Sequence, residues 1–222
     1  MRVSQGFVFL GVFILLAPCL VFGASGSRIV LVTGFEPFGT HAVNPSQEIA
    51  ETLNGSIIND SVIIGIVLPV NFTTSVQQAS EAIATYHPDL VISLGLNAKA
   101  THIEVEKISV NIKRYPKEDG SWSFPWRIEK NGVFLRFTSL GTSEIARKIQ
   151  DVGIPAKQSF FAGTYICNAL FYGLLGYIHE QGSNTAMGFI HVPLLDSQDP
   201  QGMPLEKLVD AVKIAICVSL SE

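Results

Sequence analysis

Cysteine is scarce in this chain. The 222 residues include three cysteines, and because Cys19 lies in an N-terminal apolar run, only Cys167 and Cys217 remain beyond it. Two cysteines cannot build the dense framework of a disulfide-stabilised scaffold, and no Cys/His cluster downstream has the spacing of a metal site. An exported protein can still join the two cysteines, so the sequence leaves a Cys167–Cys217 disulfide open.

An excess of charge of one sign is also missing. Lys and Arg number 15 against 19 Asp and Glu, which gives a net charge of −4. No basic run occurs, which argues against nucleic acid as a partner. The chain also lacks a P-loop and a Gly-rich dinucleotide fingerprint, which disfavours a protein of phosphate or nucleoside chemistry. The composition is typical of a soluble globular protein that handles something small.

The one long apolar run stands at the N-terminus. A short basic start precedes an apolar stretch from Phe7 to Phe22 and then small residues, which is the plan of a secretory signal with cleavage after Gly23 or Ala24. The alternative is an uncleaved anchor, since the run is only slightly shorter than a membrane helix. We therefore expect residues 1–23 to be a signal peptide or membrane anchor and residues 24–222 to form a single domain. The protein is expected to be secreted or extracytoplasmic, and membrane-anchored if the leader is retained.

Strand and helix patterns alternate after the leader. Continuously apolar runs predict buried strands over residues 28–35, 61–70, 89–95 and 185–195, and amphipathic patterns predict helices over 45–55, 73–87, 143–153 and 204–220. Alternation with strands that are apolar on both faces predicts an α/β fold: an open, largely parallel twisted sheet covered by helices on both sides. Residues 101–140 interrupt the pattern with short alternating strands and Pro/Gly loops, so a small antiparallel excursion and a flap are expected there.

The carboxyl ends of parallel strands meet at one edge of such a sheet, where sites collect. This rule places residues 34–38, residues 95–99 and the region after His191 at one rim. Cys167 stands at the proposed start of another helix, where unpaired backbone N–H groups and the helix dipole stabilise a thiolate. Cysteine is also among the most often buried residues, so the segment alone fits a packing residue as well as a nucleophile.

His191 lies at the end of its strand, directly before the turn that Pro193 imposes, and can face a cleft at the rim. A satisfied, partly buried histidine is the alternative. A Cys–His pair needs a third group to orient the imidazole. Glu104 and Glu106 are the acidic candidates, and their spacing points both to the same face of a strand, which also fits a solvated face.

The order of several motifs resembles that of pyroglutamyl peptidase I, a family of cysteine peptidases that remove N-terminal pyroglutamate. The motifs are VLVTGFEPFGTHAVNPSQEIAETLNG, LPVNF, PDLVISLGL, the spacing of Glu106 and Asn111, AGTYICN and GFIHVP. The resemblance spans nearly all of the chain after the leader. It implies that Cys167 is the nucleophile, His191 the general base and Glu106 the acidic partner that holds the histidine. It also implies that Phe35 and Phe38 enclose the pyrrolidone ring.

Two loops depart from the family pattern. The family usually has a Gly-Gly-Arg run after the third strand and an Asp-Ala-Arg-Ile-Pro run after the asparagine, whereas this chain has LNAKATH and, after Asn111, IKRYPKEDG. Leu96 stands where a ring-contacting glutamine is often found, and Lys99 or Arg114 could take part of the role of a missing arginine. The alternative function is therefore a catalytically weak or inactive relative that binds capped peptides.

The resemblance also sets expectations for partners. Acyl transfer through a thiol needs no metal or organic cofactor, and the substrates would be N-terminally pyroglutamylated peptides. We expect a homo-oligomer. Cys217, on the apolar stripe of the last helix, is expected to be free or to bridge between subunits rather than to pair with Cys167.

Overall fold

The structure is a computed structural model that describes residues 28–221. The expected leader, residues 1–23, lies outside the described residues. The strands are β1 (Arg28–Phe35), β2 (Ile57–Ile58), β3 (Ser61–Leu68), β4 (Leu90–Leu96), β5 (Ile103–Glu106), β6 (Ile108–Val110), β7 (Leu135–Phe137), β8 (Ala156–Ser159) and β9 (Ala186–Val192). The helices are α1 (Pro45–Leu53), α2 (Thr74–Tyr86), α3 (Thr142–Asp151), α4 (Ile166–Glu180) and α5 (Leu205–Ser219).

Seven of the strands form one sheet in the order β2-β3-β1-β4-β9-β5-β8. β1 pairs in parallel with β3 and β4, and β4 pairs in parallel with β9. β2 is antiparallel to β3, while β5 is antiparallel to β9 and parallel to β8. The predicted, largely parallel sheet is confirmed. The antiparallel part comprises the separate β6–β7 pair and also places β5 inside the main sheet.

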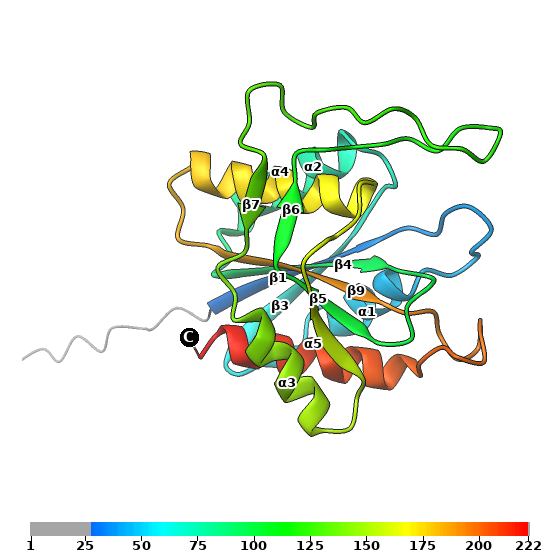
Figure 1. The fold of residues 1–222 in the computed structure, drawn as a ribbon. Coiled ribbons are helices and arrows are strands. Elements are labelled where there is room, and N and C mark those ends of the chain that lie inside the picture. Colours follow the sequence, from blue (N-terminus) through cyan, green and yellow to red (C-terminus); the bar gives the residue numbers. More distant parts are fainter. Residues whose placement is uncertain (1–27, 222) are drawn as a thin grey trace, which may run out of the picture.

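Helices cover both faces of the sheet, as predicted (Figure 1). One apolar layer joins the sheet to α1, α3 and α5, and the other joins it to α2 and α4. β4 is buried at every position because both of its faces are covered, which explains its continuously apolar sequence. Within residues 28–221, no helix is both long enough and apolar enough to span a membrane.

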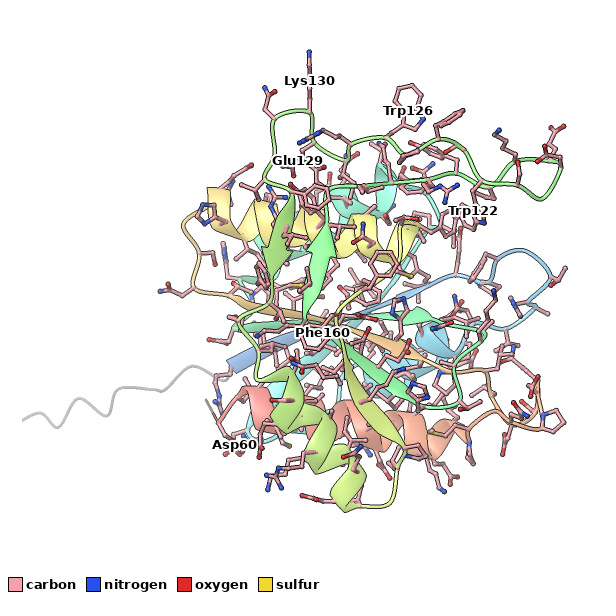
Figure 2. The ribbon with its side chains drawn as sticks, viewed as in Figure 1. Asp60, Trp122, Trp126, Glu129, Lys130 and Phe160 are labelled. Atoms are coloured by element: carbon pink, nitrogen blue, oxygen red, sulfur yellow. The ribbon has the colours of Figure 1, made fainter. Side chains whose placement is uncertain are left out.

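The hairpin that joins β2 to β3 was not expected from the sequence. Its two central residues, Asn59 and Asp60, have φ angles of 48° and 58°, the left-handed values of a tight type I′ turn. Asp60 lies at the edge of the molecule, far from the long loop between β6 and β7 (Figure 2). A two-residue strand is too short for hydrophobic periodicity to reveal, and the Asn-Asp pair is its only local signal.

Residues 111–134 form a long arm between β6 and β7, in the segment where a flap was expected. The arm runs past α4 and α2 on the upper side of the view (Figure 1). At its base, the buried Asn111 side chain accepts a hydrogen bond from the Glu129 N–H at 2.9 Å and donates to the Glu129 carbonyl at 2.9 Å. Arg136 holds the Glu129 carboxylate through two bonds of 2.7 and 2.6 Å and stacks on Tyr172. The arm is therefore fixed to α4 at its base.

Candidate active site

Cys167 is the second residue of α4, and its side chain is half-buried. The chain enters the helix through Gly163, whose φ of 80° favours glycine, and through Tyr165, which provides no side-chain cap. The first turn contains no acidic residue. The positive end of the helix dipole, at the first N–H groups of α4, is therefore not compensated by an acidic residue of the first turn. This positive end favours a thiolate and a developing oxyanion.

Asn168 fixes the start of α4 against β6. Its fully buried side chain accepts a hydrogen bond from the Val110 N–H at 2.9 Å and donates to the Val110 and Ile112 carbonyls, each at 2.9 Å. The Arg114 N–H donates to the Thr164 carbonyl at 2.7 Å. These bonds tie the turn that presents Cys167 to the base of the arm.

His191 and Glu106 form a buried pair. In the antiparallel register, Glu104 is the cross-strand partner of His191, and Glu106 is that of Phe189. Both glutamate side chains therefore lie on the same side of the sheet as the imidazole. The His191 Nδ1 and Glu106 Oε1 atoms are 2.8 Å apart, and the two residues are 7% and 1% exposed. The second carboxylate oxygen of Glu106 has no hydrogen-bond partner within residues 28–221.

Cys167 lies on the other side of the imidazole. Burial lowers the pKa of His191, but hydrogen bonds with Cys167 and Glu106, and the charges of both, outweigh burial and raise that pKa to about 10. Gly95 forms the wall behind the thiol, since a Cβ atom there would stand 2.7 Å from Cys167 Sγ. The structure thus brings Cys167, His191 and Glu106 together from α4, β9 and β5.

These residues open into a cleft of about 730 Å³. Phe38, Leu96 and Trp122 give it an apolar lining, and Asn97, Lys99 and Glu104 give it a polar side. Phe38 therefore lines the cleft, and its contact with a pyrrolidone ring stays a prediction. Phe35 does not line the cleft, because it is 2% exposed and packs into the core between the sheet, α2 and α4.

The aromatic roof of the cleft was missed by the sequence reasoning. Trp122 reaches the cleft from the arm and meets Tyr165 edge-on, with ring centroids 5.5 Å apart. Phe72 meets Tyr165 in the same way at 5.4 Å. Trp126 points away from the body of the molecule (Figure 2). The one available signal was the density of aromatic residues in SWSFPW, and nothing in that run says which tryptophan turns inward.

Glu104 interacts with neighbouring polar side chains rather than forming a hydrogen bond with the histidine. Burial raises the pKa of its carboxyl, but hydrogen bonds from Asn97 and Lys157, aided by the charge of His191, lower it overall. The Asn97 bond is 2.7 Å long and the Lys157 ammonium lies at 3.2 Å. Glu104, Glu106 and His191 offer ligand atoms within 4.8 Å of one another, so they are the residues that could hold a cation. Hydrogen-bond donors of the protein already occupy Glu104 and one oxygen of Glu106. The cluster is therefore better suited to proton transfer than to binding a cation.

Cys217 lies on α5 and is half-buried, and among the cysteines that the structure describes neither Cys217 nor Cys167 forms a disulfide. A Cys167–Cys217 bridge is therefore not formed in this structure. The expected free state of Cys217 agrees with this finding, while a bridge between subunits stays a prediction.

Comparison with known proteins fits this geometry. The family model described as pyroglutamyl peptidase matches residues 28–222. Pyrrolidone-carboxylate peptidase 2 of Caldanaerobacter subterraneus is 37% identical over 196 residues, which cover 85% of this chain and 95% of that protein. The pyrrolidone-carboxylate peptidase of Bacillus subtilis is 33% identical over 84% of this chain and 89% of its own length.

Solved structures of similar proteins also resemble the fold of this chain closely. The pyroglutamyl peptidase I of Bacillus amyloliquefaciens superposes with a TM-score of 0.82 at 33% identity and covers 88% of this chain and 98% of that one. The pyrrolidone carboxyl peptidase of Thermococcus litoralis gives 0.81 at 33% identity, over 87% and 94% of the two chains. With sequence, fold and the Cys167–His191–Glu106 cluster in agreement, this chain belongs to the pyroglutamyl peptidase family.

Proposed function

We propose that the protein is a cysteine exopeptidase that releases N-terminal pyroglutamate from peptides. The observation that carries the proposal is the convergence of a thiol at a helix start, a buried imidazole and a buried carboxylate at one cleft. These are the parts that acyl transfer through a thiol requires: a nucleophile, a base and a group that orients the base. Family membership supports the same activity.

In the proposed mechanism, Cys167 is the nucleophile and His191 its acid and base. His191, which is hydrogen-bonded to Cys167, takes the proton of the thiol as the sulfur attacks. The sulfur attacks the pyroglutamyl carbonyl, and N–H groups at the start of α4 stabilise the oxyanion. His191 then protonates the leaving amine. Water, giving its proton to His191, hydrolyses the thioester to free pyroglutamate and restores the thiol.

Glu106 holds the Nδ1 side of the ring through its 2.8 Å hydrogen bond. This bond leaves Nε2 for Cys167 and stabilises the positive ring by its charge. Its burial matters because charge interactions are stronger away from water. Glu106 thus acts on the reaction through His191 and is proposed as a positioning residue.

The cleft suits a neutral, flat group. A pyroglutamyl residue has no free amine, so apolar walls with a few hydrogen-bonding groups fit it better than a charged pocket. Phe38, Leu96 and Trp122 are the apolar walls nearest to this description. Phe35 contributes from beneath, as part of the core that also packs against Cys167.

The test is hydrolysis of a pyroglutamyl-coumarin amide by reduced, folded protein, before and after alkylation of the thiol. We expect turnover that alkylation removes. Absence of any turnover by the reduced protein would sink the proposal. In that case, isothermal titration with a pyroglutamyl peptide would identify the alternative, a relative that binds without hydrolysis.

We further propose that residues 24–222 fold as one domain, that this domain works outside the cytoplasm, and that it forms homo-oligomers. The leader sequence supports export, with a membrane tether if it is retained. Exposed aromatic side chains support self-association, among them Phe124, Trp126 and Phe160, which are 85%, 63% and 61% exposed. N-terminal sequencing of the exported protein and light scattering after size exclusion test these proposals.

A further inference from the structure

We infer that Lys99 is a specificity-determining residue that binds a carboxylate on the leaving side of the substrate. The preferred substrates would then be short pyroglutamyl peptides that carry a free terminal carboxylate or an acidic side chain directly after the scissile bond. The inference rests on the proposed function and adds a substrate class to it.

Lys99 is the one charged side chain of the cleft that lacks a partner within residues 28–221. The acidic and basic side chains that line the cleft are Lys99, Glu104 and His191. Glu104 is engaged by Asn97 and lies 3.2 Å from the Lys157 ammonium, while His191 is paired with Glu106. The Lys99 side chain makes no such hydrogen bond or ion pair, so its ammonium is available to a ligand.

The backbone that carries Lys99 is well fixed. The Asn97 N–H donates to the Val192 carbonyl at 2.9 Å, beside the strand end that carries His191. The Lys99 N–H donates to Asn97 Oδ1 at 3.2 Å, and the Ala100 N–H donates to the Asn97 carbonyl at 3.0 Å. The ammonium is thus presented on a flexible stem from a turn that is held in place, which limits the entropy lost on binding.

This turn is close to the reacting thiol. Gly95, which packs against Cys167 Sγ, precedes Lys99 by only four positions on the same rim. In a pyroglutamyl dipeptide, the terminal carboxylate lies one residue beyond the scissile bond, and a residue spans only about 3.3–3.6 Å. A carboxylate so near the bond stays inside the cleft that Lys99 lines.

The acidic neighbour of Lys99 does not form an ion pair with the Lys99 ammonium. Asp199 lines a small adjoining hollow together with Lys99. Its Oδ1 atom accepts a hydrogen bond from the Gln201 N–H at 2.7 Å, and no ion pair joins it to the lysine. Asp199 contributes background negative charge, which the substrate carboxylate would have to overcome, so a modest preference is expected rather than an absolute one.

The experiment compares pyroglutamyl-alanine with its C-terminal amide in wild type, Lys99→Met and Lys99→Glu. Lys130→Met is the matched control, because Lys130 is exposed on the arm and points away from the body of the molecule (Figure 2). In wild type and Lys130→Met, kcat/KM should favour the free acid by about three- to fivefold, mainly through KM. The ratio should fall to about one in Lys99→Met and invert in Lys99→Glu. Raising NaCl from low to high concentration should shrink the wild-type preference.

Three results would overturn the inference. The first is a wild-type enzyme without acid preference, and the second is a Lys99→Met variant that keeps the preference. The third is a uniform loss of kcat for acid and amide alike in the Lys99 variants, which would place the charge of Lys99 at the reacting carbonyl instead. The pyroglutamyl-coumarin amide separates these failures from failure of the proposed function, because it carries no carboxylate and its turnover by wild type establishes the activity alone.

Discussion

The pair of His191 and Glu106 gives the sharpest prediction. We consider Glu106→Gln, which removes the carboxylate charge and keeps a similar shape. The glutamine oxygen can still accept from Nδ1, so the ring orientation survives, but the imidazolium loses its buried counter-charge. Activity should therefore fall less than in His191→Ala, which removes the base and should cost about 100- to 10,000-fold in kcat.

The magnitude follows from the geometry. An opposite charge within about 4–6 Å shifts a pKa by about 1–3, or about 1.4–4 kcal/mol. The Nδ1 and Oε1 atoms are 2.8 Å apart and both residues are buried, so the upper half of that range is expected. In wild type, the pKa of His191 is raised to about 10, and activity should decline as the pH rises through that value. In Glu106→Gln, the decline should move to lower pH by about 2–3 pH units.

The same linkage acts on stability. A histidine whose folded-state pKa lies above its ordinary value of 6.5 stabilises the fold fully below that pH, and the stabilisation is lost as the pH rises through about 10. The free energy of unfolding should therefore depend less on pH across this window in Glu106→Gln.

The assay is kcat/KM of the coumarin amide from pH 5 to 11, with urea unfolding at matched pH values. Glu104→Gln is the control, since that carboxylate lies on the same strand face but is already engaged by Lys157 and Asn97. It should move the alkaline limb much less. An alkaline limb that stays in place in Glu106→Gln would refute the reasoning.

Three further substitutions test other contacts. Cys167→Ser should abolish hydrolysis and leave the melting temperature nearly unchanged, and substantial residual activity would require another nucleophile. Gly95→Ala should reduce kcat by more than about tenfold, because its Cβ would stand 2.7 Å from Cys167 Sγ and 2.9 Å from the Phe189 ring; wild-type kinetics would contradict this close packing. Asn168→Ala should cost about 2–5 kcal/mol in urea unfolding, since buried Val110 and neighbouring backbone groups lose their partners; a loss below 1 kcal/mol would speak against the anchor.

The parallel half of the sheet could be predicted because the sequences of its strands indicate that they are buried. β1, β4 and β9 are nearly continuous apolar runs, and such runs occur where helices cover both faces. The rule that strand ends share one edge then placed Gly95, Lys99 and His191 together. The role of Cys167 could not be read from its own segment, since a helix start and a packing position use the same residue type. The order of the motifs is what favours the nucleophile, a role that the resemblance implies.

The rest depends on long-range geometry that local patterns do not encode. β5 has four residues, and nothing in them states that it pairs antiparallel with β9, yet this pairing brings Glu106 to His191. Phe35 and Phe38 belong to one motif but lie in different environments. Phe35 is the last residue of its strand and is buried in the core, whereas Phe38 follows the end of that strand. The inward turn of Trp122 likewise depends on how the arm pairs with itself, through the isolated bridges Pro116–Trp122 and Lys113–Trp126.

The anchoring of α4 by Asn168 has a consequence for folding. The Asn168–Val110 bonds join positions 58 apart in the chain, and the His191–Glu106 bond joins positions 85 apart. Contacts of such long range must overcome the entropy of closing large loops, so we expect them to form late. During refolding, helical signal should therefore return before peptidase activity. A chain released before its last strand is in place would carry an ordinary cysteine, which gains its reactivity only when the final contacts close.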